Sequence, residues 1–146
     1  MGMGGGGGSQ AAGYQLGSYW SPGGLPSGYS VYTKNLAIAA GVYAELLVKG
    51  VSRPITAGKT FYVTGIVSDL MNNTTGVSFA QVGYADDAAG TGFVNLMTLG
   101  ANAPSIPAYH VEYNLVTSIP AGKYVVALSD ASYATYGLVM VQGYEV

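Results

Sequence analysis

From Lys34 onward, apolar and polar residues alternate in short runs that are separated by turn residues. The clearest run, residues 109–116, alternates His110, Glu112 and Asn114 with apolar residues, the period-2 pattern of a half-buried strand. Seven runs predict strands: Val42–Val48, Thr60–Val67, Val77–Tyr84, Phe93–Leu99, Tyr109–Val116, Tyr124–Leu128 and Leu138–Tyr144. Strands at this spacing predict an all-β sandwich or barrel.

One segment fits two periodicities. Leu36, Ala39, Ala40, Tyr43 and Leu47 recur at intervals of three and four residues, as on one face of a helix. The glycines that interrupt and follow the segment, and the β-branched and aromatic neighbouring runs, favour a strand instead.

Two turn phrases echo each other. Ile55–Lys59 and Ile119–Lys123 both read Ile-x-Ala-Gly-Lys, and each precedes an aromatic-rich run. One copy in each half of the chain predicts two related corners of one sandwich. A paired anion site at Lys59 and Lys123 is the functional alternative, although lysines in turns are usually only solvated.

The first 33 residues differ in composition from the rest of the chain. They hold eleven of the 23 glycines and no charged side chain. We therefore predict an extended arm over residues 1–33 and a β-sandwich domain over residues 34–146. The predicted interface residues are the aromatic side chains of this arm: Tyr14, Tyr19, Trp20, Tyr29 and Tyr32.

Composition alone also allows other interpretations of this arm. The run Gly4–Gly8 is typical of a flexible linker or a disordered tail, and Met1 followed by Met3 is compatible with an expression scar. Ordering such a segment costs about 1–2 kcal/mol per residue in backbone entropy. A lone strand of Gly, Ser and Tyr has nothing to fold against, so we expect an ordered arm to dock on another chain.

Charged residues are scarce over the whole chain. They make up 8% of the sequence, against roughly 25% in an average soluble domain. Weakly charged, apolar-rich surfaces tend to associate, which predicts a homo-oligomer. The alternative is a surface of uncharged polar residues that stays monomeric.

The same numbers exclude several partners. Five basic and seven acidic side chains are spread singly, so no basic patch is predicted to bind nucleic acid. The longest apolar stretch, residues 36–48, contains Glu45 and is shorter than the roughly 20 residues that span a bilayer, so no membrane contact is predicted. The N-terminus lacks the pattern of a secretory signal, and we expect assembly in a cytoplasm.

The candidate catalytic residues lack the partner residues that catalysis needs. His110, beside Glu112, is a conceivable general base, but there is no second histidine and no cysteine. We therefore interpret His110 as a surface or interface residue and predict no catalytic residue and no enzyme.

Metal and cofactor signals are weak as well. Asp86, Asp87 and Asp69, with Asn72, carry oxygen atoms of the kind that bind calcium. The spacing of a calcium-binding loop is absent, so these are candidates only. Gly4–Gly8 has no Gly-Lys-Ser/Thr ending that would bind phosphate. No cofactor is predicted.

Two phrases carry a family resemblance. Ile119–Val125 and the terminal Gly143–Val146, together with the echo at Ile55–Phe61, resemble small jelly-roll proteins of tailed-phage virions. The resemblance covers residues 42–146, and similar phrases occur in other viral and sugar-binding jelly rolls. It implies a jelly-roll-like antiparallel β-sandwich.

Within that group, the compact β domain with its arm is similar to head decoration, or cement, proteins. These typically form trimers on the capsid surface, which implies a homotrimer, contact with the major capsid protein or other virion proteins, and a place on the virion. A tail, fibre or receptor-binding protein, a filament subunit and a carbohydrate-binding module are the alternatives. Aromatic rings gathered on one face would favour sugar binding, whereas rings spread over arm, core and contacts would favour assembly.

Overall fold

The computed structural model describes residues 29–103, 109–113 and 117–146, of which 109–113 are described as backbone alone. These residues form strands and no helix, and every pair of strands is antiparallel. The strands are β1 (Tyr29–Ile38), β2 (Tyr43–Glu45), β3 (Leu47–Val48), β4 (Phe61–Asn72), β5 (Ser78–Ala85), β6 (Val94–Ala101), β7 (Tyr109–Tyr113), β8 (Thr117–Ile119), β9 (Tyr124–Leu128) and β10 (Thr135–Glu145).

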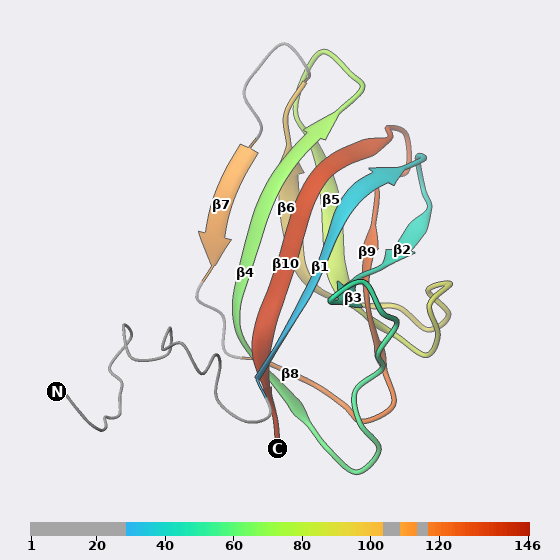
Figure 1. Ribbon diagram of the computed structural model, residues 1–146. Coiled ribbons are helices and arrows are strands. Elements are labelled where there is room, and N and C mark those ends of the chain that lie inside the picture. The colour runs from blue at the N-terminus through green and yellow to red at the C-terminus, as the bar shows by residue number, and fades with distance from the viewer. Residues whose placement is uncertain (1–28, 104–108, 114–116) are drawn as a thin grey trace, which may run out of the picture.

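Two sheets face each other across the core (Figure 1). Sheet A has the order β3-β1-β10-β4-β7, and sheet B has the order β2-β9-β5-β6. β8 continues the edge begun by β7, because β7 pairs with residues 66–70 of β4 and β8 with residues 61–63. Counting β7 and β8 as one edge, and leaving out the two-residue β3, the order is that of an eight-stranded jelly roll. The predicted all-β, jelly-roll-like sandwich is confirmed.

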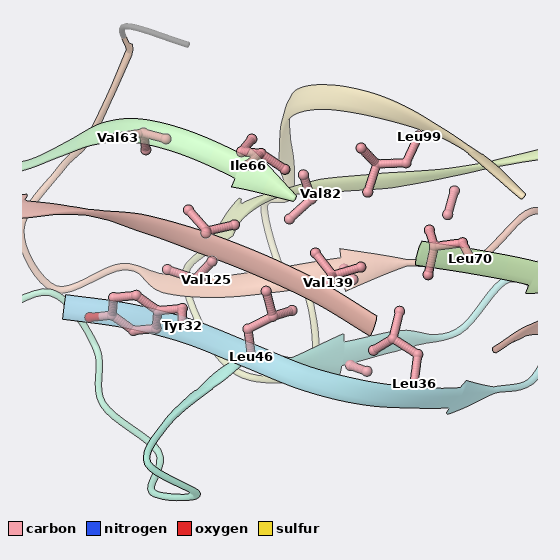
Figure 2. Packing of buried hydrophobic residues seen from close by; sticks show 14 of the residues in the cluster. Tyr32, Leu36, Leu46, Val63, Ile66, Leu70, Val82, Leu99, Val125 and Val139 are labelled. Atoms are coloured by element: carbon pink, nitrogen blue, oxygen red, sulfur yellow. The ribbon is translucent and has the colours of Figure 1, made fainter. Parts of the chain in front are cut away.

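The core lies between the sheets and is filled by alternate residues of their strands. Figure 2 shows Leu36, Leu70 and Val139 of sheet A facing Val82 and Val125 of sheet B. At one end, the ring of Tyr32 meets that of Phe61 edge to face, with 5.3 Å between centroids. Burying alternate aliphatic residues in this way is what makes period-2 segments fold as strands.

The strand predictions were right in kind but incomplete. Residues 36–48 form the end of β1, a turn, β2 and β3, so their helical interpretation is wrong. The turn needs Gly41, whose φ is +68°, and a helix cannot continue through that conformation. β4 runs five residues beyond the predicted end at Val67, and β1 and β8 were not predicted.

The predicted boundary between arm and domain must be corrected. Residues 29–33, assigned to the arm, belong to β1 and pair with β10. Their period-2 pattern continues that of the buried residues of β1, so burial against sheet B outweighs the glycine-rich context. Residues 1–28 lie outside the described part of the chain.

The two echo turns lie side by side. Ile55 N–H donates to the Lys123 carbonyl, and Gly122 N–H donates to the Ile55 carbonyl, both at 2.8 Å. Gly58 and Gly122 take up φ values of +79° and +75°, which explains the shared Ala-Gly step. The predicted related corners thus meet at one end of the sandwich, the end where β1 begins and β10 finishes (Figure 1).

Strand β10 depends on a glycine where it approaches β4. A Cβ atom on Gly137, whose φ is +114°, would lie 2.0 Å from the Asp69 carbonyl oxygen. We expect Gly137→Ala to lower the free energy of unfolding by at least about 2 kcal/mol, because both the clash and the φ value oppose it.

Urea unfolding followed by circular dichroism measures this change. Gly76→Ala is the matched control, since nothing lies within 4 Å of the place that an added Cβ would take and its φ is not left-handed. Equal stability of the two variants would contradict the close approach of β10 to β4.

Candidate functional site

The most unusual surface is the face of sheet A that points away from the core. Its positions alternate with core residues along β1, β10 and β4 and lie opposite one another in the strand register. Five positions on each strand make up this outer A face: Tyr29, Val31, Thr33, Asn35 and Ala37; Tyr136, Leu138, Met140, Gln142 and Tyr144; Tyr62, Gly65, Val67, Asp69 and Met71.

This outer A face is apolar and nearly free of charge. Asp69 is its single charged side chain, whereas the solvent face of an antiparallel sheet ordinarily carries polar residues. Tyr62 is 48% exposed and Tyr136 is 39% exposed, so the two ends of the face reach solvent, and Val67, Leu138 and Met140 between them are half-buried. Exposed apolar surface of this extent is typical of an interaction site.

A row of tyrosines crosses one end of the outer A face. Tyr29 pairs with Tyr144, which pairs in turn with Tyr62. The rings of Tyr29 and Tyr144 meet edge to face at 5.2 Å. Partial burial, and then the neighbouring Tyr144, raise the pKa of Tyr29. Such rings, with an apolar body and a polar tip, are favoured at protein interfaces.

The outer face of sheet B is partly covered by the chain itself. The loop between β5 and β6 places Gly90 so close to Tyr43 that an added Cβ would lie 2.3 Å from the ring. Tyr43 also packs on Phe93, with 5.3 Å between ring centroids. Val126 and Ala85 are buried although they do not belong to the central core.

Beside this covered region lies an open groove of about 440 Å³. A row of side chains from all four strands, Tyr43, Leu128, Gln81 and Thr98, crosses it. Phe79, 58% exposed, stands at its side. An aromatic ring beside amide and hydroxyl groups is a combination that can bind a small polar ligand.

A buried polar cluster fastens the end of the sandwich where the chain begins and finishes. Glu145 is only 8% exposed. Its carboxylate accepts hydrogen bonds from the Thr56 hydroxyl at 2.6 Å and the Thr56 N–H at 3.2 Å, and Arg53 lies 3.8 Å away. Arg53 also donates to the Ser30 hydroxyl at 3.2 Å. The cluster therefore ties β10, β1 and the loop before β4 together.

Tyr32 lies next to this cluster and corrects one predicted interface residue. It is 0% exposed, so it belongs to the core and is not available to a partner. Its hydroxyl has no hydrogen-bond partner among the described residues. Burial, and then the nearby Glu145, raise the pKa of Tyr32 to about 12, against a smaller opposing effect of Arg53.

The other predicted interface residues have different outcomes. Tyr29 lies on the outer A face, whereas Tyr14, Tyr19 and Trp20 lie outside the described residues.

The calcium candidates are not brought together. Asp86 forms an ion pair with Lys123, and Asp87 accepts hydrogen bonds within its own loop. Bonds from the Thr91 hydroxyl and N–H lower the pKa of Asp87. Asp69 lies on β4 near the opposite end of the sandwich. Across the described residues, no three His, Cys, Asp or Glu side chains form a group able to hold a metal ion.

The structure also places the other candidate residues from the sequence: the fourth oxygen candidate, the lysine pair and the histidine. Asn72, the fourth oxygen candidate, is buried at the end of β4, and its side-chain carbonyl accepts the Thr74 N–H at 2.9 Å. Lys123 is occupied by Asp86, which removes the basis for a paired anion site with Lys59. His110 belongs to β7, described as backbone alone, so its side chain and that of Glu112 lie outside the description.

Comparison with known proteins gives no family assignment. No family model, no curated protein and no solved structure matches the chain. In the part of the chain that is described, no helix is long and apolar enough to cross a membrane.

The sequence patterns did not predict two features of the structure, the outer A face and the pairing of Arg53 with Glu145. The outer A face has a signal, the unbroken apolar run from Leu138 to Val141, which is typical of a strand covered on both sides. The pairing of Arg53 with Glu145 has none, because the two residues are far apart in the chain and each stands among uncharged neighbours.

Tyr32→Phe tests the buried hydroxyl through the pH dependence of stability. The folded chain holds the Tyr32 proton up to a pKa of about 12, whereas an unfolded chain releases it near 10. The folded state therefore binds more protons between these values, and stability that is fully present below pH 10 is lost as the pH rises toward 12.

Over this window we expect the free energy of unfolding of the variant to fall by about 1–2 kcal/mol less than that of the parent. At pH 7 the variant should be no less stable, since the hydroxyl has no partner among the described residues. Urea unfolding at pH 7 and pH 11 measures both effects, with Tyr62→Phe on the surface as the control. A marked loss of stability of Tyr32→Phe at pH 7 would show that the hydroxyl is bonded after all.

Proposed function

We propose that this chain is a non-enzymatic structural subunit of a phage particle, a decoration protein that forms a homo-oligomer on the head surface. A trimer is the expected form, from the resemblance to such proteins. Contacts with the major capsid protein through residues 1–28 would hold neighbouring capsid subunits together. The protein would be made in the host cytoplasm and end on the virion.

The outer A face is the observation that carries this proposal. A sandwich whose core is already complete has no internal need for a second apolar layer on sheet A, and exposing one favours association. The aromatic residues support the same proposal. Beside the row of Tyr29, Tyr144 and Tyr62 on the outer A face, they also lie in the core (Tyr32) and on sheet B (Tyr43), so they are not confined to one face as in a sugar-binding module.

The place where the described chain begins supports a role for the arm. Tyr29 starts β1 at the end of sheet A that also carries the C-terminus, so residues 1–28 join the sandwich beside the tyrosine row. Fully extended, 28 residues reach roughly 90 Å at about 3.3 Å each, more than twice the length of β4. An arm of this reach can contact several neighbouring subunits, and its affinity then accumulates by multivalency.

Deletion of residues 1–28 tests the arm. The deletion must end at residue 28, because removal of Tyr29 and Ser30 would also shorten β1 and remove the hydrogen bond from Arg53 to Ser30. We expect a folded sandwich, with binding to phage heads that lack this protein reduced at least about tenfold, since the multivalent contacts are lost.

Co-sedimentation with such heads measures the binding, and thermal unfolding checks the fold. A variant with the same 28 residues in scrambled order controls for length and composition. Undiminished binding of the deletion variant would refute the role of the arm.

The groove on sheet B favours a second candidate function, binding of a neutral sugar. Phe79 stands on β5 opposite Gly100, so the neighbouring strand does not cover its ring. Gln81 and Thr98 provide amide and hydroxyl groups next to it. A sugar ring can stack its C–H face on the aromatic ring while its hydroxyls bond to these groups.

Phe79→Ala is the test of sugar binding. A glycan array identifies any glycan that the full chain binds. If the groove binds a sugar, the variant should bind that glycan at least about tenfold more weakly, because the stacking surface is gone. Tyr133→Ala removes an exposed ring outside the groove and should change nothing. Absence of any glycan hit for the full chain, or equal binding by both variants, would eliminate this candidate.

A further inference from the structure

We propose that the outer A face packs against the same face of neighbouring copies of this chain. This inference rests on the proposed function and names the surface through which the subunits associate. Three properties of the described residues lead to it: the size of the face, its lack of charge and its width.

The size of the outer A face fits a stable interface. β1 has ten residues, which at about 3.3 Å per residue gives a length of roughly 33 Å. Three strands, β1, β10 and β4, give a width of about 14 Å at roughly 4.8 Å each. The flat area is therefore roughly 500 Å², before the corrugation of side chains is counted, and specific interfaces bury upward of about 600 Å² on each partner.

The composition of the face selects a partner that is equally uncharged. Its residues include no Lys or Arg, so nothing attracts an acidic partner. Asp69 is its one carboxylate and lies next to the β7 edge, where Glu112 is in register with Val67, so charge is confined to that edge. Aromatic residues and Met, such as Tyr62, Tyr136 and Met140, are enriched in interface cores. A second copy offers the same apolar surface, and most homo-oligomers form from self-complementary surfaces of this kind.

The width of the face argues against the arm as its main cover. An extended segment occupies about one strand spacing, roughly 5 Å, whereas the face is about three spacings wide. Residues 1–28 contain eleven glycines, which add no side chain to pack on Val67 or Met140. Another sheet, packed at the usual distance of about 10 Å, covers the full width at once.

Single-cysteine variants test the proposal without background, because the chain has no cysteine. Tyr62→Cys and Tyr136→Cys lie at the two ends of the outer A face and are exposed in the single chain. Thr98→Cys lies exposed on sheet B and serves as the control. Light scattering gives the mass of each full-length variant, and the rate of maleimide labelling reports thiol accessibility.

We expect an oligomer in which the Tyr62→Cys and Tyr136→Cys thiols react at least about tenfold more slowly than that of Thr98→Cys. Dilution to the monomer should remove the difference. As a second test, Met140→Lys should give a folded monomer, because it places a charge on the central strand β10, at the centre of the packed faces, whereas Thr98→Lys should remain an oligomer.

The outcomes separate this inference from the proposed function. An oligomer whose face A thiols react as fast as that of Thr98→Cys overturns the inference, since another surface then joins the subunits, and leaves the structural role standing. A full-length chain that is monomeric at high concentration but still binds phage heads also overturns the inference alone. A monomer that binds no particle overturns both.

Discussion

The insertion of the C-terminal strand between β1 and β4 is the constraint on which the rest of the sandwich depends. β10 pairs along its whole length with β1 on one side and β4 on the other, so sheet A is continuous only when the last residues of the chain are in place. The close approach to β4 requires Gly137 and Gly143, where any side chain would meet a backbone carbonyl at 2.0 Å. Glu145 then fastens the end of the strand to the loop that carries Arg53 and Thr56. Long-range pairing of this kind makes the fold topologically complex, and such folds form slowly.

The central position of β10 also explains the outer A face. Val139 and Val141 point into the core, and Leu138 and Met140, which alternate with them in the sequence, point outward along the midline of the sheet. A strand that is apolar on both sides is typical of sheets covered on both faces. The chain supplies a cover for one face, sheet B, and the described residues supply none for the other. The inward residues of this strand thus stabilise the fold, and the outward residues that alternate with them are available for association.

The sequence predicted those parts of the fold that depend on local pattern. Period-2 runs and turn residues located most strands, because burial on one side imposes alternation whatever the partner strand is. β1 was missed because Tyr29 and Tyr32 follow a glycine-rich, uncharged stretch and look the same as the tyrosines before them. Only the register with β10 separates Tyr32, in the core, from Tyr29, on the surface. The contact between the echo turns was likewise invisible, since identical phrases indicate similar conformation and not proximity.

The candidate site was predictable in kind but not in place. Scarcity of charge indicated an associating surface, yet composition does not say which face of which sheet is apolar. The positions of the charges answer that question. Nine of the twelve charged residues lie in loops or at the ends of strands; the exceptions are Lys34, Asp69 and Glu112. Several of the nine are engaged locally, as Asp86 is with Lys123. Charges at the two ends keep the loops solvated and leave the broad sides of the sandwich with few charges. Subunits of this shape can associate side by side with their strands facing one another, and the outer A face is the side that the described residues leave uncovered.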